Sequence, residues 1–208
     1  ILLPLLDICL FIIQIGKEAF FACEKLSTIK LPDNLQDIGA GAFAYTGLTS
    51  INLPSNLRYI GDGAFATTFI TSIVIPSGVT VVKLETFNYC TRLTSVELPQ
   101  SITGIRTSAF MGCQSLVSIN IPESCKNIPM SCFYRCLALP TIHLPQSVTS
   151  IYADAFAECH ALTTINLESV MRISLAAFRN CTSLNSIIIN DEAYVEEDAF
   201  KGCTLLKE

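Results

Sequence analysis

Cysteine and histidine have the most specific chemistry among the residue types of this 208-residue chain, which contains ten Cys and two His. Thiolates and imidazoles are the usual ligands of zinc. One stretch brings several of them together, namely Cys132, Cys136, His143, Cys159 and His160. The spacing lacks the C-x₂-C pair of a compact zinc site, and two of these cysteines belong to a regular column described below. The sequence therefore predicts no metal site and no other cofactor.

Catalytic motifs are missing from the sequence. It has no nucleophile–His–acid arrangement, no P-loop, no G-x-G-x-x-G and no H-E-x-x-H, and its acidic residues are scattered among variable positions. We therefore expect a protein that is not an enzyme and has no catalytic residues.

Composition and charge exclude further classes of protein. Half of the residues are hydrophobic, which excludes a disordered chain. The net charge is −5 and no basic cluster is visible in the sequence, which argues against a nucleic-acid partner. The longest apolar run, Ile8 to Ile13, is far shorter than the roughly 18 residues of a membrane-spanning helix, so no membrane insertion by this segment is expected.

A repeat of 22 or 23 residues organises the whole chain. Nine of the 12 phenylalanines follow each other at this spacing: Phe20, Phe43, Phe65, Phe87, Phe110, Phe133, Phe156, Phe178 and Phe200. Five positions before each Phe is an aliphatic residue, and three positions after it is Cys, or Thr in the case of Thr46 and Thr68. A triplet of the form L-x-x-I-x-L follows, and in most repeats Pro comes next.

The fold follows from this periodicity, because a unit of this length cannot bury its own apolar residues and must stack on its neighbours. The I-x-L part of each triplet alternates like a strand, and one strand per repeat predicts a parallel sheet of eight strands. We expect the Ala-Phe segments to form short helical turns on the opposite side, with Phe as the bulky core residue. Residues 1–208 are thus predicted to be one α/β solenoid of about nine repeats. Because the chain starts at Ile1, with half a repeat, we interpret it as a fragment excised from a longer protein.

The ten cysteines do not require a disulfide framework. Seven occupy the position three residues after the repeated Phe, and Thr replaces Cys there twice without a compensating change in another column. A small buried residue explains this better than a set of bridges, which need paired positions and suitable Cβ geometry. We predict free, buried thiols, and such thiols are compatible with either redox compartment.

The repeat resembles leucine-rich repeats, and the motif L-x-x-I-x-L-x-x-N is intact at 26–34 and 48–56. In other repeats the last position is Gly or Ser, and a small polar side chain there is expected to hydrogen-bond the turning backbone of a neighbouring repeat. The extended pattern L-x-x-I-x-L-P-x-x-L-x-x-I-x-x-x-A-F-x-x-C, seen at Ile29–Pro32 and Ala19–Cys23, resembles the BspA-like class. The resemblance implies a right-handed superhelix with one parallel sheet face and short strands or helical turns on the other side.

The expected sheet exposes one central residue per strand, and we predict this column to be the ligand-binding site. Its members are Lys30, Asn52, Val74, Glu97, Asn120, His143, Asn166 and Ile188. Polar side chains in this column suit contacts with a protein or a glycan, whereas solvent exposure alone would equally explain their types.

What the resemblance implies about function is a cell-surface or secreted adhesin, which binds host-cell or extracellular-matrix proteins. The alternative is a cytoplasmic scaffold or signalling-partner module of the same fold, since buried free thiols are compatible with it.

Overall fold

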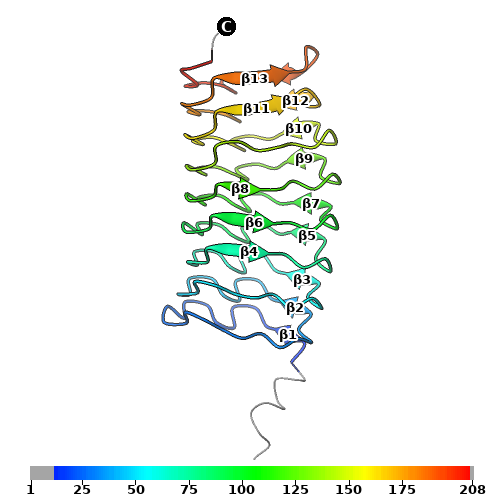
Figure 1. Cartoon of the computed structure of the whole chain (residues 1–208), viewed down its shortest axis with the longest axis vertical. Helices are drawn as coiled ribbons and strands as arrows, with labels where there is room; N and C mark the ends of the chain where they lie inside the picture. Colours follow the sequence, from blue (N-terminus) through cyan, green and yellow to red (C-terminus); the bar gives the residue numbers. More distant parts are fainter. Residues whose placement is uncertain (1–11, 207–208) are drawn as a thin grey trace, which may run out of the picture.

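The computed structural model describes residues 12–206, which form a stack of parallel coils (Figure 1). We number the coils 1 to 9 by the phenylalanine that each contains, from Phe20 to Phe200. Their succession gives about eight full turns. The predicted half repeat at the start of the chain, and Cys9 within it, lie outside the described residues.

Each coil contributes a two-residue strand to one side of the stack, which we call the short-strand face. The face comprises these strands and the residues within two positions of the aliphatic residue that ends each of them. Its strands are β1 (Gln14–Ile15), β2 (Asp37–Ile38), β3 (Tyr59–Ile60), β5 (Val81–Val82), β7 (Gly104–Ile105), β9 (Asn127–Ile128), β10 (Ser150–Ile151), β12 (Arg172–Ile173) and β14 (Tyr194–Val195). Pairing is parallel and in register by one repeat, as in Ile38 opposite Ile60. These are the short strands that the sequence predicted on the second side.

The second side with strands, the long-strand face, contains the I-x-L segments. Its strands are β4 (Ser72–Val74), β6 (Ser95–Glu97), β8 (Ser118–Ile119), β11 (Thr164–Leu167) and β13 (Ser186–Ile189). They pair in parallel as β4-β6-β8 and β11-β13, and a bridge from Thr141 to Thr164 continues the second set. The prediction of eight strands is wrong for residues 29–31, 51–53 and 142–144, which are not strands. In the last case Pro140 and Pro145 flank the segment and provide no amide hydrogen for a ladder.

The longest strands of this face coincide with the coils that lack the usual Pro. The two longest, β11 and β13, belong to the coils in which Glu168 and Asn190 replace the usual Pro. Because these residues keep their amide hydrogens, the backbone there can close a turn that Pro would prevent.

The Ala-Phe segments are not helical, and in this respect the α/β prediction is wrong: residues 12–206 contain no helix. In every coil, the residues two positions before and two positions after the Phe have a positive φ, for example Gly41 (60°) and Tyr45 (58°) around Phe43. Every second amide then points along the stack instead of along a helix axis. The amides of Gly41, Phe43 and Tyr45 thus donate to carbonyls of the next coil at 2.8–2.9 Å. Backbone bonds between coils replace the i to i−4 bonds of a helix.

The phenylalanines form the centre of the core, as the sequence predicted. Successive rings stack nearly parallel, with centroids 5.0–5.7 Å apart from Phe20 to Phe200. The seven rings between the two terminal ones are fully buried. Aliphatic residues of both strand ladders pack around this stack. One continuous core thus joins all the described coils.

Candidate functional site

All eight residues predicted for the ligand-binding column are exposed. Val74 and Glu97 lie opposite each other on β4 and β6, and Asn166 and Ile188 do so on β11 and β13. Lys30, Asn52 and His143 lie on extended segments that are not strands. The structure therefore arranges the column along one face, with adjacent members about 4.8 Å apart in the direction of the stack.

Asn120 has a structural partner that the sequence did not reveal. Its side-chain amide donates to the carbonyl of Leu98 at 2.7 Å, and its Oδ1 accepts from the amide of Leu98 at 2.9 Å. The side chain thus extends the backbone ladder beyond the end of β8, where Asn120 no longer pairs through its own backbone. Asn120 is therefore exposed but is engaged with the preceding coil.

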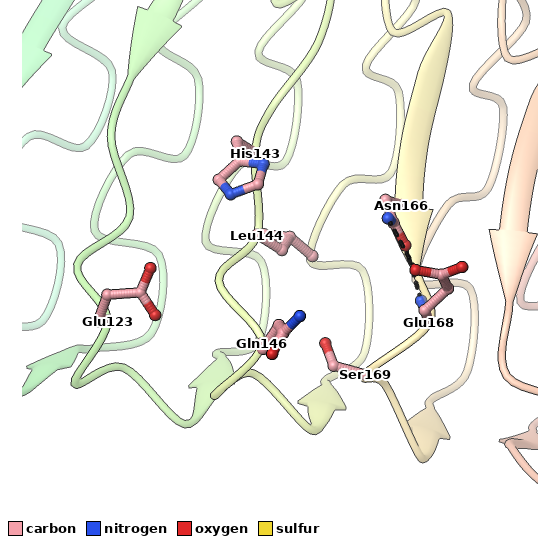
Figure 2. Close-up of a pocket in the computed structure, with 7 residues that line it drawn as sticks. All are labelled: Glu123, His143, Leu144, Gln146, Asn166, Glu168 and Ser169. Carbon is pink, nitrogen blue, oxygen red and sulfur yellow. Dashed lines mark hydrogen bonds between the residues drawn. The ribbon is translucent and has the colours of Figure 1, made fainter.

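A hollow of about 680 Å³ opens at the edge of the long-strand face, where three coils turn away from it (Figure 2). Its lining is mostly polar: Glu123, His143, Leu144, Gln146, Asn166, Glu168 and Ser169. His143 and Asn166 come from the predicted column, and Figure 2 shows them on neighbouring coils at the same end of the hollow. The hollow is therefore where the predicted column meets a concave surface.

A turn holds two of the lining residues in place. The amide of Glu168 donates to Oδ1 of Asn166 at 2.9 Å, and Nδ2 of Asn166 donates to Oε2 of Glu168 at 3.3 Å. This is an Asx turn, which the usual Pro would abolish because it has no amide hydrogen. The substitution of Pro by Glu168 thus fixes both side chains at the rim.

A second hollow, of about 420 Å³, adjoins the first on the long-strand face and shares His143 and Asn166 with it. Thr141, Thr164 and Ser186 provide hydroxyl groups there, and Ile188 provides an apolar edge. Imidazole, amide, hydroxyl and carboxylate groups in these hollows can donate and accept hydrogen bonds. The surface suits recognition of polar groups.

The sequence did not identify four residues of the larger hollow: Glu123, Gln146, Glu168 and Ser169. They lie in the loops after the strands, where the repeat pattern is least regular. The absence of Pro at position 168 was the available signal. The structure confirms the predicted polar ladder for Ser101 and Ser147, whose hydroxyls each donate to a carbonyl of the preceding coil. Ser169 continues this ladder, since its hydroxyl donates to the carbonyl of Val148.

The cysteine column is confirmed as a set of free thiols among the described residues. Each thiol of this column from Cys90 onward donates to the carbonyl of the Phe in the preceding coil, as Cys136 does to Phe110 at 3.3 Å. Burial raises the pKa of Cys90 to about 11 and that of Cys159 to about 12. Protonated, buried thiols are poor nucleophiles and poor metal ligands. Cys23 differs from the prediction because it is exposed in coil 1, which has a described neighbour on one side only.

The residues considered as zinc ligands lie in different parts of the coil. Cys132, Cys136 and Cys159 are buried in the core, whereas His143 and His160 are exposed. Within residues 12–206, no three His, Cys, Asp or Glu side chains form a group that could hold a metal ion. The same residues contain no helix that could span a membrane.

Comparison with known families gives a match over nearly the whole chain. The family model described as the BspA type leucine-rich repeat region matches residues 6–116 and 84–207, with six copies. No enzyme family is indicated. A comparison with curated proteins found no significant match.

Solved structures with similar folds come from bacteria. A leucine-rich cell surface protein of Faecalibacterium prausnitzii is 28% identical with a TM-score of 0.58, and the match covers 84% of this chain and 62% of that protein. A leucine-rich repeat protein of T. pallidum is 26% identical with a TM-score of 0.68, covering 95% and 79%. The pneumococcal vaccine antigen PcpA is 20% identical with a TM-score of 0.61, covering 94% and 58%, and shares the fold. The chain thus spans less than two thirds of the length of the first of these proteins.

Proposed function

The chain belongs to the BspA-type leucine-rich repeat family, and we propose that it is a non-enzymatic binding module of a cell-surface adhesin. Its ligand in this proposal is a host-cell or extracellular-matrix protein, bound through the long-strand face around His143 and Asn166. The similarity to a cell surface protein of Faecalibacterium prausnitzii supports the location. The polar lining of the larger hollow and the hydroxyl groups of the smaller one support the binding face.

The observation that carries the proposal is the concave surface that His143 and Asn166 share. An exposed residue needs no functional explanation, but two adjoining hollows that share the same pair of side chains offer a partner a concave surface with hydrogen-bonding groups. The stacked core behind them is continuous, so the face is rigid. A rigid surface binds with a small loss of conformational entropy.

Protease treatment of intact source cells tests the location. If the proposal is correct, external protease removes this chain while a cytosolic marker protein stays intact. Full protection of the chain would contradict the surface location and favour the cytoplasmic scaffold instead.

A panel of immobilised matrix proteins tests the ligand class. Fibronectin, laminin and collagen are suitable probes, with serum albumin as the negative control and surface plasmon resonance as the readout. We expect saturable binding to at least one matrix protein. Absence of binding to every member, by a chain that melts cooperatively, would contradict the proposed ligand class.

A further inference from the structure

Basic residues that are far apart in the sequence lie together on the short-strand face. Coils 3 to 6 each contribute one: Arg58, Lys83, Arg106 and Lys126, all within two positions of the buried aliphatic residue of the short strand. With coils about 4.8 Å apart, the four side chains span roughly 14 Å along the stack. A chain with a net charge of −5 thus has a local row of positive charge.

The acidic residues near this row lie at one end of it, beside the cations of coils 3 and 4. Arg58, Arg106 and Lys126 are exposed, and none of them forms an ion pair among the described residues. Asp37 lies opposite Tyr59, Asp62 lies in coil 3, and Glu85 follows Leu84 in coil 4. The short-strand face of coils 5 and 6 has no acidic residue beside Arg106 and Lys126. The Lys83 ammonium lies 5.4 Å from the ring centroid of Tyr59, which leaves its charge in place.

A mostly apolar hollow of about 670 Å³ adjoins this row and is lined by residues of coils 5 to 9. Its exposed apolar side chains are Met130, Tyr152 and Leu175, which are 49%, 42% and 51% exposed. Arg106 lies at the N-terminal end of its lining and Glu196 at the other end. Exposed side chains of this size grouped around a concave surface are typical of an interaction site.

Glu196 does not cancel the positive row. It accepts hydrogen bonds from the amide of Leu175 and from the guanidinium of Arg172, and these donors hold its pKa below the ordinary value. Its charge is therefore balanced locally by Arg172 at the far end of the hollow. The approach from Arg106 remains positive.

We propose that the short-strand face is a second binding surface, which takes an acidic peptide segment with an apolar anchor. The anchor would fill the hollow between Met130, Tyr152 and Leu175, and the carboxylates would meet Arg106 and the cations beside it. An extended peptide rises about 3.3 Å per residue, so four or five acidic residues match the length of the row. Arg, Tyr and Met are also the residue types enriched in protein interfaces.

The apolar hollow is the reason for choosing a peptide over a sulfated glycan or a nucleic acid. A polyanion without apolar groups would use the row of cations and leave the hollow empty. A peptide uses both, and burying Met130, Tyr152 and Leu175 would add a contribution of about 25 cal/mol per Å² of apolar surface.

Fluorescence anisotropy with defined peptides tests this proposal. The probe is a labelled peptide with four consecutive acidic residues followed by Leu-Phe. It is measured at about 50 mM salt, where interactions between charges are screened less than at physiological ionic strength. The comparison peptides replace the acids by Asn and Gln, or Leu-Phe by Ser-Ser. We expect the first peptide to bind at least about tenfold more tightly than either comparison peptide, a difference of about 1.4 kcal/mol.

Two variants locate the binding. Arg106→Glu with Lys126→Glu should weaken binding of the probe by at least about tenfold. Lys25→Glu with Arg92→Glu changes the net charge equally at exposed positions outside both strand faces, and should change binding less than about twofold. Leu175→Ser should also weaken binding of the probe but not of the Ser-Ser peptide. Equal melting temperatures confirm that all variants are folded.

Three outcomes would overturn the proposal. The first is no binding of the probe up to about 1 mM. The second is equal weakening by the two charge-reversal pairs. The third is that heparin or single-stranded DNA binds and that the Ser-Ser peptide binds as tightly as the probe. The face would then recognise a polyanion without an apolar anchor.

Discussion

The side chain of Asn120 closes two hydrogen bonds with the backbone of Leu98, one coil earlier, and so substitutes for a strand pair. A residue that sequence periodicity places in the binding column is therefore part of the scaffold. Variants designed to test binding should avoid Asn120. The side chain of Asn166 bonds with Glu168 in its own turn and does not join two coils, so His143 with Asn166 is the better pair.

Asn120→Ala should lower the free energy of unfolding by about 1–2 kcal/mol, because two side-chain hydrogen bonds to the backbone are lost. Asn52→Ala is the matched control, since Asn52 occupies the same column in coil 2, is exposed, and makes no such bond. Its free energy of unfolding should change by less than about 0.5 kcal/mol. Urea titration measures both, and equal values for the two variants would contradict the role assigned to Asn120.

Gly63→Ala tests the conformation of the Phe segments by the sign of its effect. Gly63 has a φ of 58°, and a Cβ there would meet only the Cβ of Ala66, 3.9 Å away. We expect destabilisation by about 1 kcal/mol, the cost of a left-handed residue with a side chain. If the segment were helical, the same substitution would instead stabilise the protein by about 1 kcal/mol, because Ala is a better helix former than Gly.

Gly104→Ala is the control for this experiment, because Gly104 lies in β7, has no positive φ and has free space for a Cβ. Its substitution should be neutral or slightly stabilising, since Ala restricts the unfolded chain. Thermal unfolding of both variants decides between the two conformations. Stabilisation by Gly63→Ala would contradict the turn structure described for these segments.

Phe110→Ala should cost about 3–5 kcal/mol of stability, because it leaves a cavity in the continuous stack between Phe87 and Phe133. Phe69→Ala is the control, since Phe69 is 41% exposed and contacts the guanidinium of Arg92 from the surface. Its cost should stay below about 1 kcal/mol. A small effect of Phe110→Ala in chemical denaturation would be inconsistent with a core built on the phenylalanines.

The buried thiols predict a loss of stability at alkaline pH. Burial raises the pKa of Cys90 and Cys159 from 9.0 to about 11 and about 12, so the folded state binds these protons more tightly than the unfolded state. The contribution of these two thiols to the free energy of unfolding is complete below pH 9. It is lost as the pH rises toward 11 and 12, by up to about 1.4 kcal/mol per thiol and pH unit.

Cys90→Thr with Cys159→Thr should reduce this loss, since Thr does not titrate and already occupies the column at Thr46 and Thr68. The measurement is the melting temperature of the unchanged protein and of the double variant, as a function of pH from about 8 to about 12. If the melting temperature falls equally with pH in both proteins, the thiols are not responsible for the alkaline loss.

Sequence periodicity predicted the elements whose side chains repeat strictly. The Phe stack, the buried thiols and the polar ladder each come from one residue type that recurs at a fixed position of the repeat. The Phe segments were mistaken for helical turns because φ has no signature in side chains as varied as Glu85, Ser108 and Tyr45. In this case bonds between coils override local propensity.

The hollows were beyond prediction for a different reason. Their lining residues, such as Gln146 and Glu168, lie in loops at positions that the repeat leaves free. The basic row on the short-strand face was also hidden, since Arg58 and Lys126 are far apart in sequence and become neighbours of the other two cations only through stacking. Charge that is dispersed in a repeat sequence is concentrated by the solenoid.

The central claim is that the long-strand face binds a protein ligand through the surface around His143 and Asn166. The most direct test measures the affinity of the chain for a matrix protein that it binds in the panel, together with His143→Glu/Asn166→Lys, which keeps the pair's summed charge unchanged when His is neutral. His160→Glu/Thr182→Lys serves as the folded control, since both residues are exposed, lie outside both strand faces and undergo the same change of charge. We predict that the first pair weakens binding by at least about tenfold and that the control leaves it within about twofold. Unchanged affinity of the folded His143/Asn166 variant would contradict the claim and move the binding site elsewhere on the solenoid.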